Sequence, residues 1–513
     1  MMSLVKIGVS LTVCEPCKKR KKSCNKALPS CSRCSRLFAK CSYSGQGAVA
    51  AGRPSVLPPL HILSNSIPGL VVSASLPGSW DYPHGNAGHA LTTDKQVSLQ
   101  AHKLLNAISR KSGDINKFCN IYFGKFHHAL PILNKEVFYW QLQNLPSDSH
   151  FSALVLAMYL ISQMVSQSNS DEHRFDLYPT LKSIHSLLQS TGNVSHELIQ
   201  AGILISSFEY CQALFQEAWI TIGTCVRMAQ ILGLQESIRK PLSKDPDSPT
   251  MLETDRCIWW AIVIVERNIN SAWKKSELPC AAAPPQLEDF LPLTPTGEDR
   301  LREDLILPQD LEVAWSTSGP LNRNFTKFGS FAATVQSTYL AGLVVRHVQD
   351  DSRDAPTRKN DAARLEGALQ SYLCALIPPA GEAKGSYCGA FGIRTCMAYY
   401  FHDHEFEFAS KTGDTIGASR ARLAIQSMVR TSISMTRVGY TGSPIDFHGL
   451  AYWSHRLVPD TAMMHIKYGE RDDDWQSGLD LMKFYLCGLE PRFKLYANYL
   501  RDIEGAEEAA RMG

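Results

Sequence analysis

The chain has 513 residues, of which 44% are hydrophobic and 20% are charged, a composition typical of a folded soluble protein and a length that excludes a single small module. Its net charge of +3 is unevenly spread, because residues 1–45 hold ten Lys or Arg and one Glu, which leaves the remaining chain net acidic. The longest uninterrupted apolar segment has nine residues, well short of the ~20 that span a bilayer, so no membrane partner is expected. A basic end on an otherwise acidic chain indicates a protein that binds a polyanion.

Six of the fifteen cysteines lie close together near the N-terminus, with 2, 6, 6, 2 and 6 residues between them. They are Cys14, Cys17, Cys24, Cys31, Cys34 and Cys41. Structural zinc prefers four thiolates in a tetrahedron, and a CxxC pair at the start of a helical turn directs two sulfurs toward one ion. Six sulfurs satisfy two zinc ions if two are shared, and the symmetric choice is the first cysteine of each block, Cys14 and Cys31. The alternatives are redox thiols or a single-zinc knuckle with two spare cysteines.

This pattern resembles the fungal Zn2Cys6 (zinc binuclear cluster) transcription factors. Members of that family carry a basic run between the second and third cysteines, which is met here by Lys18, Lys19, Arg20, Lys21 and Lys22. The sequence also has the family's proline two residues before the fourth cysteine, Pro29, and an aromatic residue two positions after the sixth, Tyr43. It departs from the family at Ser23, where a basic residue is usual. That change is expected to weaken the grip on the DNA backbone and to shift the preferred bases.

The resemblance implies that the first helix ends in the major groove of DNA, where Lys or Arg donates to guanine O6 and N7, typically in a CGG triplet. It places Arg20 and Lys21 at base contacts, and Lys18, Lys19 and Lys22 at phosphates. The same run suits a nuclear localisation signal, so we expect a nuclear protein. Residues 10–45 are therefore predicted to form a DNA-binding domain with two zinc ions, whose partner is double-stranded DNA with CGG-type half-sites.

A flexible, disordered linker is expected over residues 46–92. From residue 44 to 90, 20 of 47 residues are Pro, Gly or Ser and only two are charged, a composition that does not favour a packed helix or sheet. A helical 4,3 spacing of apolar residues begins near Thr93 and continues to Tyr122. It fits a dimerising coiled coil or, better, an ordinary pair of core helices interrupted at Gly113, so a homodimer is left open.

Apolar stretches of helical length recur beyond that point, with neither β-type alternation nor hairpin dipeptides between them. They are Phe151 to Val165, Glu197 to Leu214, Glu217 to Leu234, Asp255 to Trp273, Phe331 to Val348, Arg420 to Met435 and Trp475 to Leu500. The chain is therefore expected to be mostly α, with residues 93–505 forming one large all-α unit.

Two segments of this unit resemble the middle homology regulatory domain of the same transcription factors. The first has Trp219, Gly223, Arg227, Ala229 and Leu232-Gly233-Leu234, and the second has Asp255-Arg256, Trp259-Trp260 and Glu266-Arg267. Together with an entry helix and loop at residues 122–133, the resemblance covers roughly residues 115–295. It departs from the family at Lys274 to Pro279, where a Gly-Arg-Pro turn is usual. The resemblance implies a regulatory domain and makes a small-molecule effector a candidate partner.

No enzyme is expected, because the sequence has no P-loop and no dinucleotide fingerprint. The run His402-Asp403-His404-Glu405 has metal-capable side chains, but its alternation separates them onto two faces and its spacing is not that of a zincin helix, which favours a surface or core-edge cluster over a metal site. The sequence thus predicts a zinc-dependent, sequence-specific transcription factor for RNA polymerase II genes, such as a metabolic or secondary-metabolite gene cluster. The alternatives are an α-helical enzyme or small-molecule receptor with an accessory zinc cluster, and a zinc-dependent scaffold that binds protein.

Overall fold

The computed structural model divides the chain into two compact units, Met1–Tyr82 and Pro83–Gly513. Within these units the structure describes residues 14–21, 24, 97–106, 108, 115–143, 148–165, 172–240, 248–272, 279–286, 289–292, 329–350, 354–376, 388–439, 456–472 and 474–512. The predicted linker, residues 46–92, lies outside the described residues.

The described part of the first unit is one short helix with the residues around it. Helix α1 (Glu15–Lys19) begins directly after Cys14, and a turn at Arg20 and Lys21 leads toward Cys24. Pro16 lies in the first turn, where its missing N–H costs no helical hydrogen bond.

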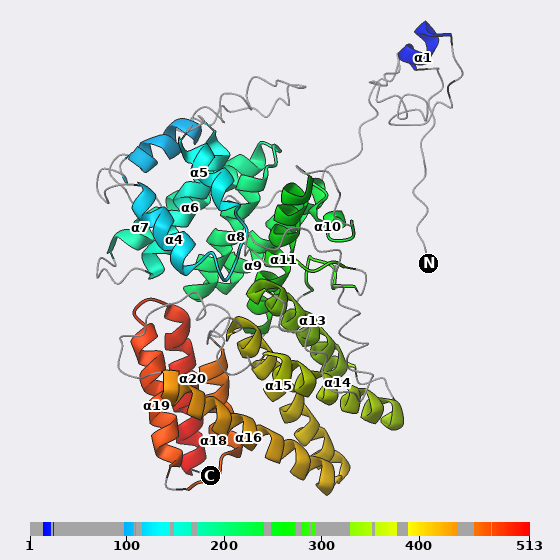
Figure 1. The fold of residues 1–513 in the computed structure, drawn as a ribbon, viewed down its shortest axis with the longest axis vertical. Coiled ribbons are helices and arrows are strands. Elements are labelled where there is room, and N and C mark those ends of the chain that lie inside the picture. Colours follow the sequence, from blue (N-terminus) through cyan, green and yellow to red (C-terminus); the bar gives the residue numbers. More distant parts are fainter. Residues whose placement is uncertain are drawn as a thin grey trace, which may run out of the picture. The chain divides into compact units, whose positions relative to one another are not determined.

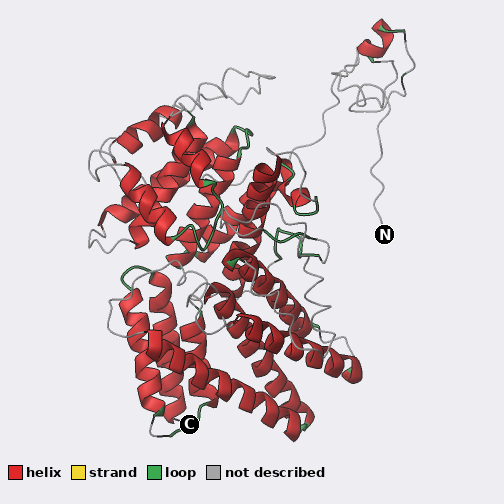
Figure 2. Ribbon diagram, in the orientation of Figure 1, coloured by secondary structure: helices red, strands yellow, loops and turns green. Residues whose placement is uncertain are grey.

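The first half of the second unit is a group of helices preceded by helical residues 97–106 (Figures 1 and 2). These helices are α4 (Ile115–Lys125), α5 (Lys135–Gln143), α6 (Ser149–Val165), α7 (Glu172–Ser190), α8 (His196–Cys211), α9 (Phe215–Ile231), α10 (Leu234–Ser237) and α11 (Ser248–Ala272). Helix α8 is the centre of this half, because every residue from Leu198 to Cys211 is buried and α6 and α9 pack against it. Its start is fixed by Ser195, whose side chain accepts a hydrogen bond from the backbone N–H of Leu198.

Close packing around α8 depends on Gly202. A Cβ atom at this position would lie 2.5 Å from the Sγ of Cys225 on α9 and 2.9 Å from the Nε2 of His185 on α7. Burial lowers the pKa of His185 to about 4, so this imidazole is neutral at physiological pH and belongs to the core. The absence of a side chain at Gly202 therefore lets three helices meet.

The second half of this unit holds the remaining labelled helices. They are α13 (Ser330–Gln349), α14 (Ala355–Leu376), α15 (Cys388–Thr412), α16 (Thr415–Gly439), α18 (Leu457–Tyr468), α19 (Trp475–Leu489) and α20 (Lys494–Met512). Helices α15 and α16 form an antiparallel pair joined at Gly413, whose φ of 77° is the left-handed conformation that glycine adopts freely (Figure 1). The two halves meet where the Gln212 side chain donates a hydrogen bond to the Arg492 carbonyl.

The predicted fold class is confirmed, since the described residues form helices and loops and include no strand (Figure 2). One apolar stretch was wrongly taken as continuous, because residues 475–500 belong to two helices, α19 and α20, which pack side by side and are joined by the ion pair of Lys483 with Glu507. The break follows at Pro491, which has no N–H to donate to a helical hydrogen bond, while Glu490 before it still has helical backbone. Helices α5, α7, α10, α14, α15 and α18 were not predicted, and the interruption expected at Gly113 lies outside the described residues.

Among the helices that the structure describes, none combines the length and the apolar character needed to cross a membrane.

Candidate zinc and DNA-binding site

Three cysteine sulfurs converge in the first unit. The Sγ atoms of Cys14, Cys17 and Cys24 all lie within 4.8 Å of one another, and those of Cys14 and Cys24 are 3.7 Å apart. Two thiolates on one tetrahedral zinc, each with a bond of about 2.3 Å, have sulfurs about 3.8 Å apart. A disulfide would need about 2.05 Å. The geometry fits shared metal ligands and not an oxidised pair, and none of the three cysteines forms a disulfide.

The local fold of α1 produces this convergence. Cys14 immediately precedes the helix and Cys17 lies within it, so one helical turn brings both sulfurs to the same side, and both residues are buried. The first helical hydrogen bond runs from the backbone N–H of Lys18 to the Cys14 carbonyl, at 2.9 Å. Lys21 ends the turn in a left-handed conformation, with φ of 51°, and its N–H donates to the Lys18 carbonyl at 3.1 Å. This reversal redirects the chain toward Cys24.

The basic side chains lie on the outside of the same turn. Lys18, Lys19, Arg20 and Lys21 are all exposed, while Cys14 and Cys17, which precede them in the chain, are 0% and 2% exposed. Lys18 and Lys19 belong to α1, and Arg20 and Lys21 follow its end. The metal side and the basic side of this segment are therefore separated, and one does not occlude the other.

Several predicted residues lie outside the described part of the chain. They are Lys22, Cys31, Cys34 and Cys41. The geometry thus covers three of the four ligands expected around one ion, while the sharing of Cys14 and Cys31 stays a prediction.

Comparison with known families gives two matches. Residues 12–47 match the fungal Zn(2)-Cys(6) binuclear cluster domain, and residues 119–273 match the fungal specific transcription factor domain. The chain therefore carries both of the domains found in its relatives, which are fungal Zn2Cys6 transcription factors. Its cluster domain binds two zinc ions and is of a DNA-binding type.

Curated relatives come from several fungi. The chain is 27% identical over 155 residues to the azaphilone cluster-specific transcription factor azaR of Aspergillus niger, which covers 28% of this chain and 33% of azaR. It is 26% identical over 146 residues to the citrinin biosynthesis transcriptional activator mrl3 of Monascus ruber, covering 28% and 29%. It is 22% identical over 347 residues to the depudecin biosynthesis cluster-specific transcription activator DEP6 of Fusarium langsethiae, covering 50% and 56%. The matched regions span less than two thirds of each of these relatives.

Three residues of the second segment that resembles the regulatory domain, Arg256, Trp260 and Glu266, contact the chain that follows α11. Trp260 donates from Nε1 to the Phe290 carbonyl at 2.9 Å, and the buried Arg256 guanidinium lies 4.9 Å from the Phe290 ring centre. Glu266 accepts hydrogen bonds from the backbone N–H groups of Ala281 and Ala282, at 2.6 and 3.1 Å. These side chains hold residues 279–286 and 289–292 against α11. A single sequence could not reveal their partners, because the segment they bind has no regular structure.

The His402 to Glu405 run forms the core-edge cluster that its alternation favoured. Glu405 accepts a hydrogen bond from His347 of α13 at 3.1 Å, and the Arg358 guanidinium of α14 lies 3.5 Å from the same carboxylate. His404 lies 3.1 Å from that guanidinium, and burial lowers the pKa of His402 to about 4. A cationic side chain therefore already stands beside the carboxylate, which does not suit a second cation.

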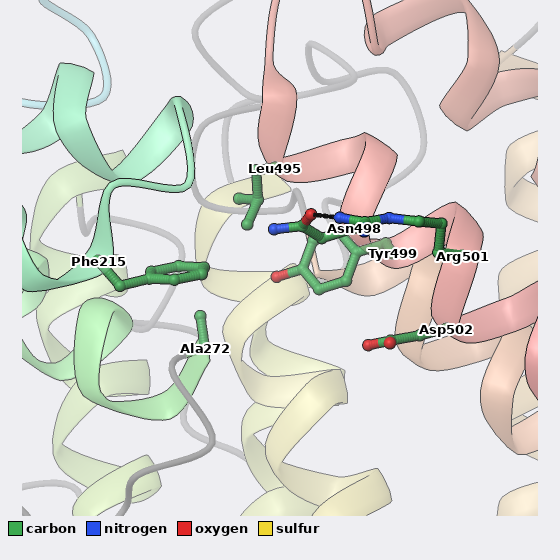
Figure 3. Close-up of a pocket in the computed structure, with 7 residues that line it drawn as sticks. All are labelled: Phe215, Ala272, Leu495, Asn498, Tyr499, Arg501 and Asp502. Carbon is green, nitrogen blue, oxygen red and sulfur yellow. Dashed lines mark hydrogen bonds between the residues drawn. The ribbon is translucent and has the colours of Figure 1, made fainter.

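A cavity of about 380 Å³ lies in the large unit where α9, α11 and α20 come together. Phe215 and Tyr499 present their rings to it, and Arg501 donates a hydrogen bond to Asn498 along one side (Figure 3). Its size is in the range of pockets that hold small organic molecules.

Proposed function

We propose that this chain is a zinc-dependent, sequence-specific transcription factor. The observation that carries the proposal is the juxtaposition of convergent sulfurs from Cys14, Cys17 and Cys24 with four exposed cations on the adjoining turn. Residues 10–45 form the DNA-binding domain, residues 46–92 the linker and residues 93–505 the regulatory domain. Cys14 and Cys31 each bridge both zinc ions.

Zinc fixes the backbone, and the basic side chains contact the DNA. Arg20 and Lys21, which follow the end of α1, read base edges in the major groove, where Lys and Arg meet guanine acceptors of a CGG-type half-site. Lys18, Lys19 and Lys22 bind phosphates and hold the register. The left-handed backbone at Lys21 supports this division, because it turns the chain away from the α1 axis at that residue.

The regulated genes belong to a biosynthetic cluster, and the protein acts in the nucleus without being an enzyme. Support comes from the relatives, whose printed names describe cluster-specific regulators of azaphilone and depudecin biosynthesis. The basic run adjoining the cluster also fits a nuclear localisation signal.

A second role, as the receptor of a small-molecule effector, is favoured by the cavity beside Phe215 and Tyr499. An effector there would contact both halves of the large unit, since α9 and α11 belong to the first half and α20 to the second.

The test is a titration of the full chain on two fluorescent duplexes, one with a CGG half-site and one with the same bases scrambled. We expect tighter binding to the CGG duplex, loss of that binding with a zinc chelator and recovery on adding zinc. The variant Cys17→Ser should behave like the chelated protein, and Cys487→Ser, at an exposed cysteine of α19, should behave like the wild type. Equal binding to both duplexes, or binding unaffected by chelation, would contradict the proposal.

A further inference from the structure

Helix α16 presents one long face to solvent. Residues with a 4,3,4,3,7 spacing along it are all exposed, and they are Ile416, Arg420, Leu423, Ser427, Arg430 and Arg437. Ile416 is 82% exposed and Leu423 is 64% exposed, values that are high for large apolar side chains. The opposite side of the helix is buried, with Ile425 and Val429 packed in the core. These six residues are called the outward face of α16.

The charge of this helix has one sign. Its 25 residues include Arg420, Arg422, Arg430 and Arg437 and no Asp or Glu. Arg420 lies 3.6 Å from Glu366 and Arg430 pairs with Glu470, but both arginines are about two-thirds exposed. Exposed ion pairs of this kind contribute little, so an incoming carboxylate can replace either partner.

The apolar residues favour a protein segment over DNA as the occupant. Ile416 and Leu423 are seven residues apart on the same stripe as the arginines, a spacing by which an amphipathic helix anchors on another helix. DNA-binding surfaces are more polar and gain nothing from burying such side chains. Ser427 lies between Leu423 and Arg430, and its small side chain allows a partner backbone to approach.

A segment of matching chemistry exists in this chain. Residues 298–315 have the sequence EDRLREDLILPQDLEVAW, with six acidic residues, two arginines and seven large apolar residues. Its net charge of −4 is equal and opposite to that of α16, and its leucines alternate with its carboxylates. These residues lie outside the described part of the chain.

The connection allows this segment to reach the outward face. Helix α13 runs alongside α15 in the same direction, because Ser337 bonds to the Ala390 carbonyl and His347 to Glu405 further along both helices. Since α15 and α16 are antiparallel, α13 begins at the end of the bundle where α16 finishes (Figure 1). Residues 316–328 precede α13 and extend up to roughly 43 Å, while α16 is about 37 Å long.

We propose that residues 298–315 dock on the outward face of α16. The carboxylates pair with Arg420, Arg430 and Arg437 of this face and with Arg422 beside it, and the leucines cover Ile416 and Leu423. The proposal concerns the large unit alone and does not depend on DNA binding by the first unit.

The experiment uses the full chain with residues 298–315 replaced by a Gly-Ser sequence of equal length. A fluorescent synthetic peptide of residues 298–315 is titrated against this protein, and anisotropy is recorded. We expect the peptide to bind the segment-replaced protein saturably, with an affinity that falls as the salt concentration is raised. Peptide binding to the intact chain should be at least tenfold weaker, because the chain's own segment competes for the same face. The variant Leu423→Glu should weaken peptide binding at least tenfold, while the control Ile231→Glu, at a 72% exposed position of α9, should not change it.

Three results would overturn the proposal, provided that circular dichroism shows every variant folded. The first is equal peptide binding by the Leu423→Glu and Ile231→Glu proteins, or by the intact and segment-replaced chains. The second is that the peptide does not bind and that the protein's affinity for a random DNA duplex falls in the Arg422→Ala variant. This result would make the face a nucleic-acid surface. The third is that the peptide does not bind and that the protein forms a dimer which dissociates in the Leu423→Glu variant. This result would make the face a contact between two copies of the chain.

Discussion

The zinc-cluster segment and helix α8 keep their shape by different means. Around α1, two fully buried residues are cysteines, and the segment has a five-residue helix that would not persist alone. Helix α8 instead has fourteen consecutive buried residues and is held by packing against its neighbours. The zinc-cluster segment depends on a metal that supplies the stabilisation its small core lacks. Helix α8 depends on the close packing of its side chains against the neighbouring helices. Damage to one unit should therefore leave the other intact.

The largest expected effect is the loss of zinc. Structural zinc contributes on the order of 10–16 kcal/mol to small cysteine-rich domains, so removing a bridging ligand should disrupt the whole first unit. We expect Cys14→Ser to release both zinc ions and Cys17→Ser to release mainly one, as measured by elemental analysis of the purified full chain. The thermal transition of the helical unit should stay where it is. Equal zinc loss in both variants would contradict the bridging assignment, and a shifted helical transition would contradict the independence of the units.

A smaller effect is expected from a methyl group in the core of the helical unit. Gly202→Ala would place a Cβ within 3 Å of Cys225 and His185, and overpacking of this kind typically costs about 1–3 kcal/mol. Gly223→Ala on α9 is the matched control, because nothing lies within 4 Å of its Cβ position. Removing a helical glycine there should raise stability by about 0.5–1 kcal/mol. Urea unfolding should show a lower free energy of unfolding for Gly202→Ala and a higher one for Gly223→Ala, with unchanged zinc content in both. A free energy of unfolding that rises in both variants would show that the packing around α8 has room for a side chain at Gly202.

An effect of about 2 kcal/mol is expected at Glu405. Burial alone raises the pKa of this carboxyl, but hydrogen bonds from His347 and His404 outweigh it and lower the pKa to about 2. Because the folded pKa is depressed, the stabilisation is complete above the ordinary pKa near 4.5 and is lost as pH falls toward 2. Glu405→Gln should therefore lower the free energy of unfolding at pH 7, with a difference from wild type that shrinks below pH 4.5. The control Glu407→Gln removes a half-exposed partner of Lys467 and should change the free energy of unfolding by less than about 1 kcal/mol. A larger change in the free energy of unfolding for Glu407→Gln than for Glu405→Gln would contradict this account.

The zinc site and the fold class were largely predictable, because both depend on short-range patterns. Cysteine spacing predicts which sulfurs converge, and the sulfurs of Cys14, Cys17 and Cys24 do so. Helical periodicity likewise predicts α6, α9 and α13 to within a few residues. The pattern fails for α15, whose apolar side chains face neighbours on several sides and so leave no single stripe to detect.

Long-range contacts were not predictable from one sequence. Glu405 is held by His347 and Arg358, which are 58 and 47 positions away on two other helices. The hydrogen bond from Gln212 to the Arg492 carbonyl joins residues that are 280 positions apart. Such pairs depend on how helices cross, which propensity and periodicity do not encode.

The most direct test of the central claim separates base reading from phosphate binding within the exposed basic turn. The full chain and its Lys21→Ala and Lys18→Ala variants are titrated on the CGG and scrambled duplexes at several salt concentrations. Lys21→Ala should cost about 1–3 kcal/mol on the CGG duplex and little on the scrambled one, whereas Lys18→Ala should weaken both alike and reduce the salt slope by about one. Equal weakening of both duplexes by Lys21→Ala, or a wild-type chain without preference for CGG, would contradict the assignment.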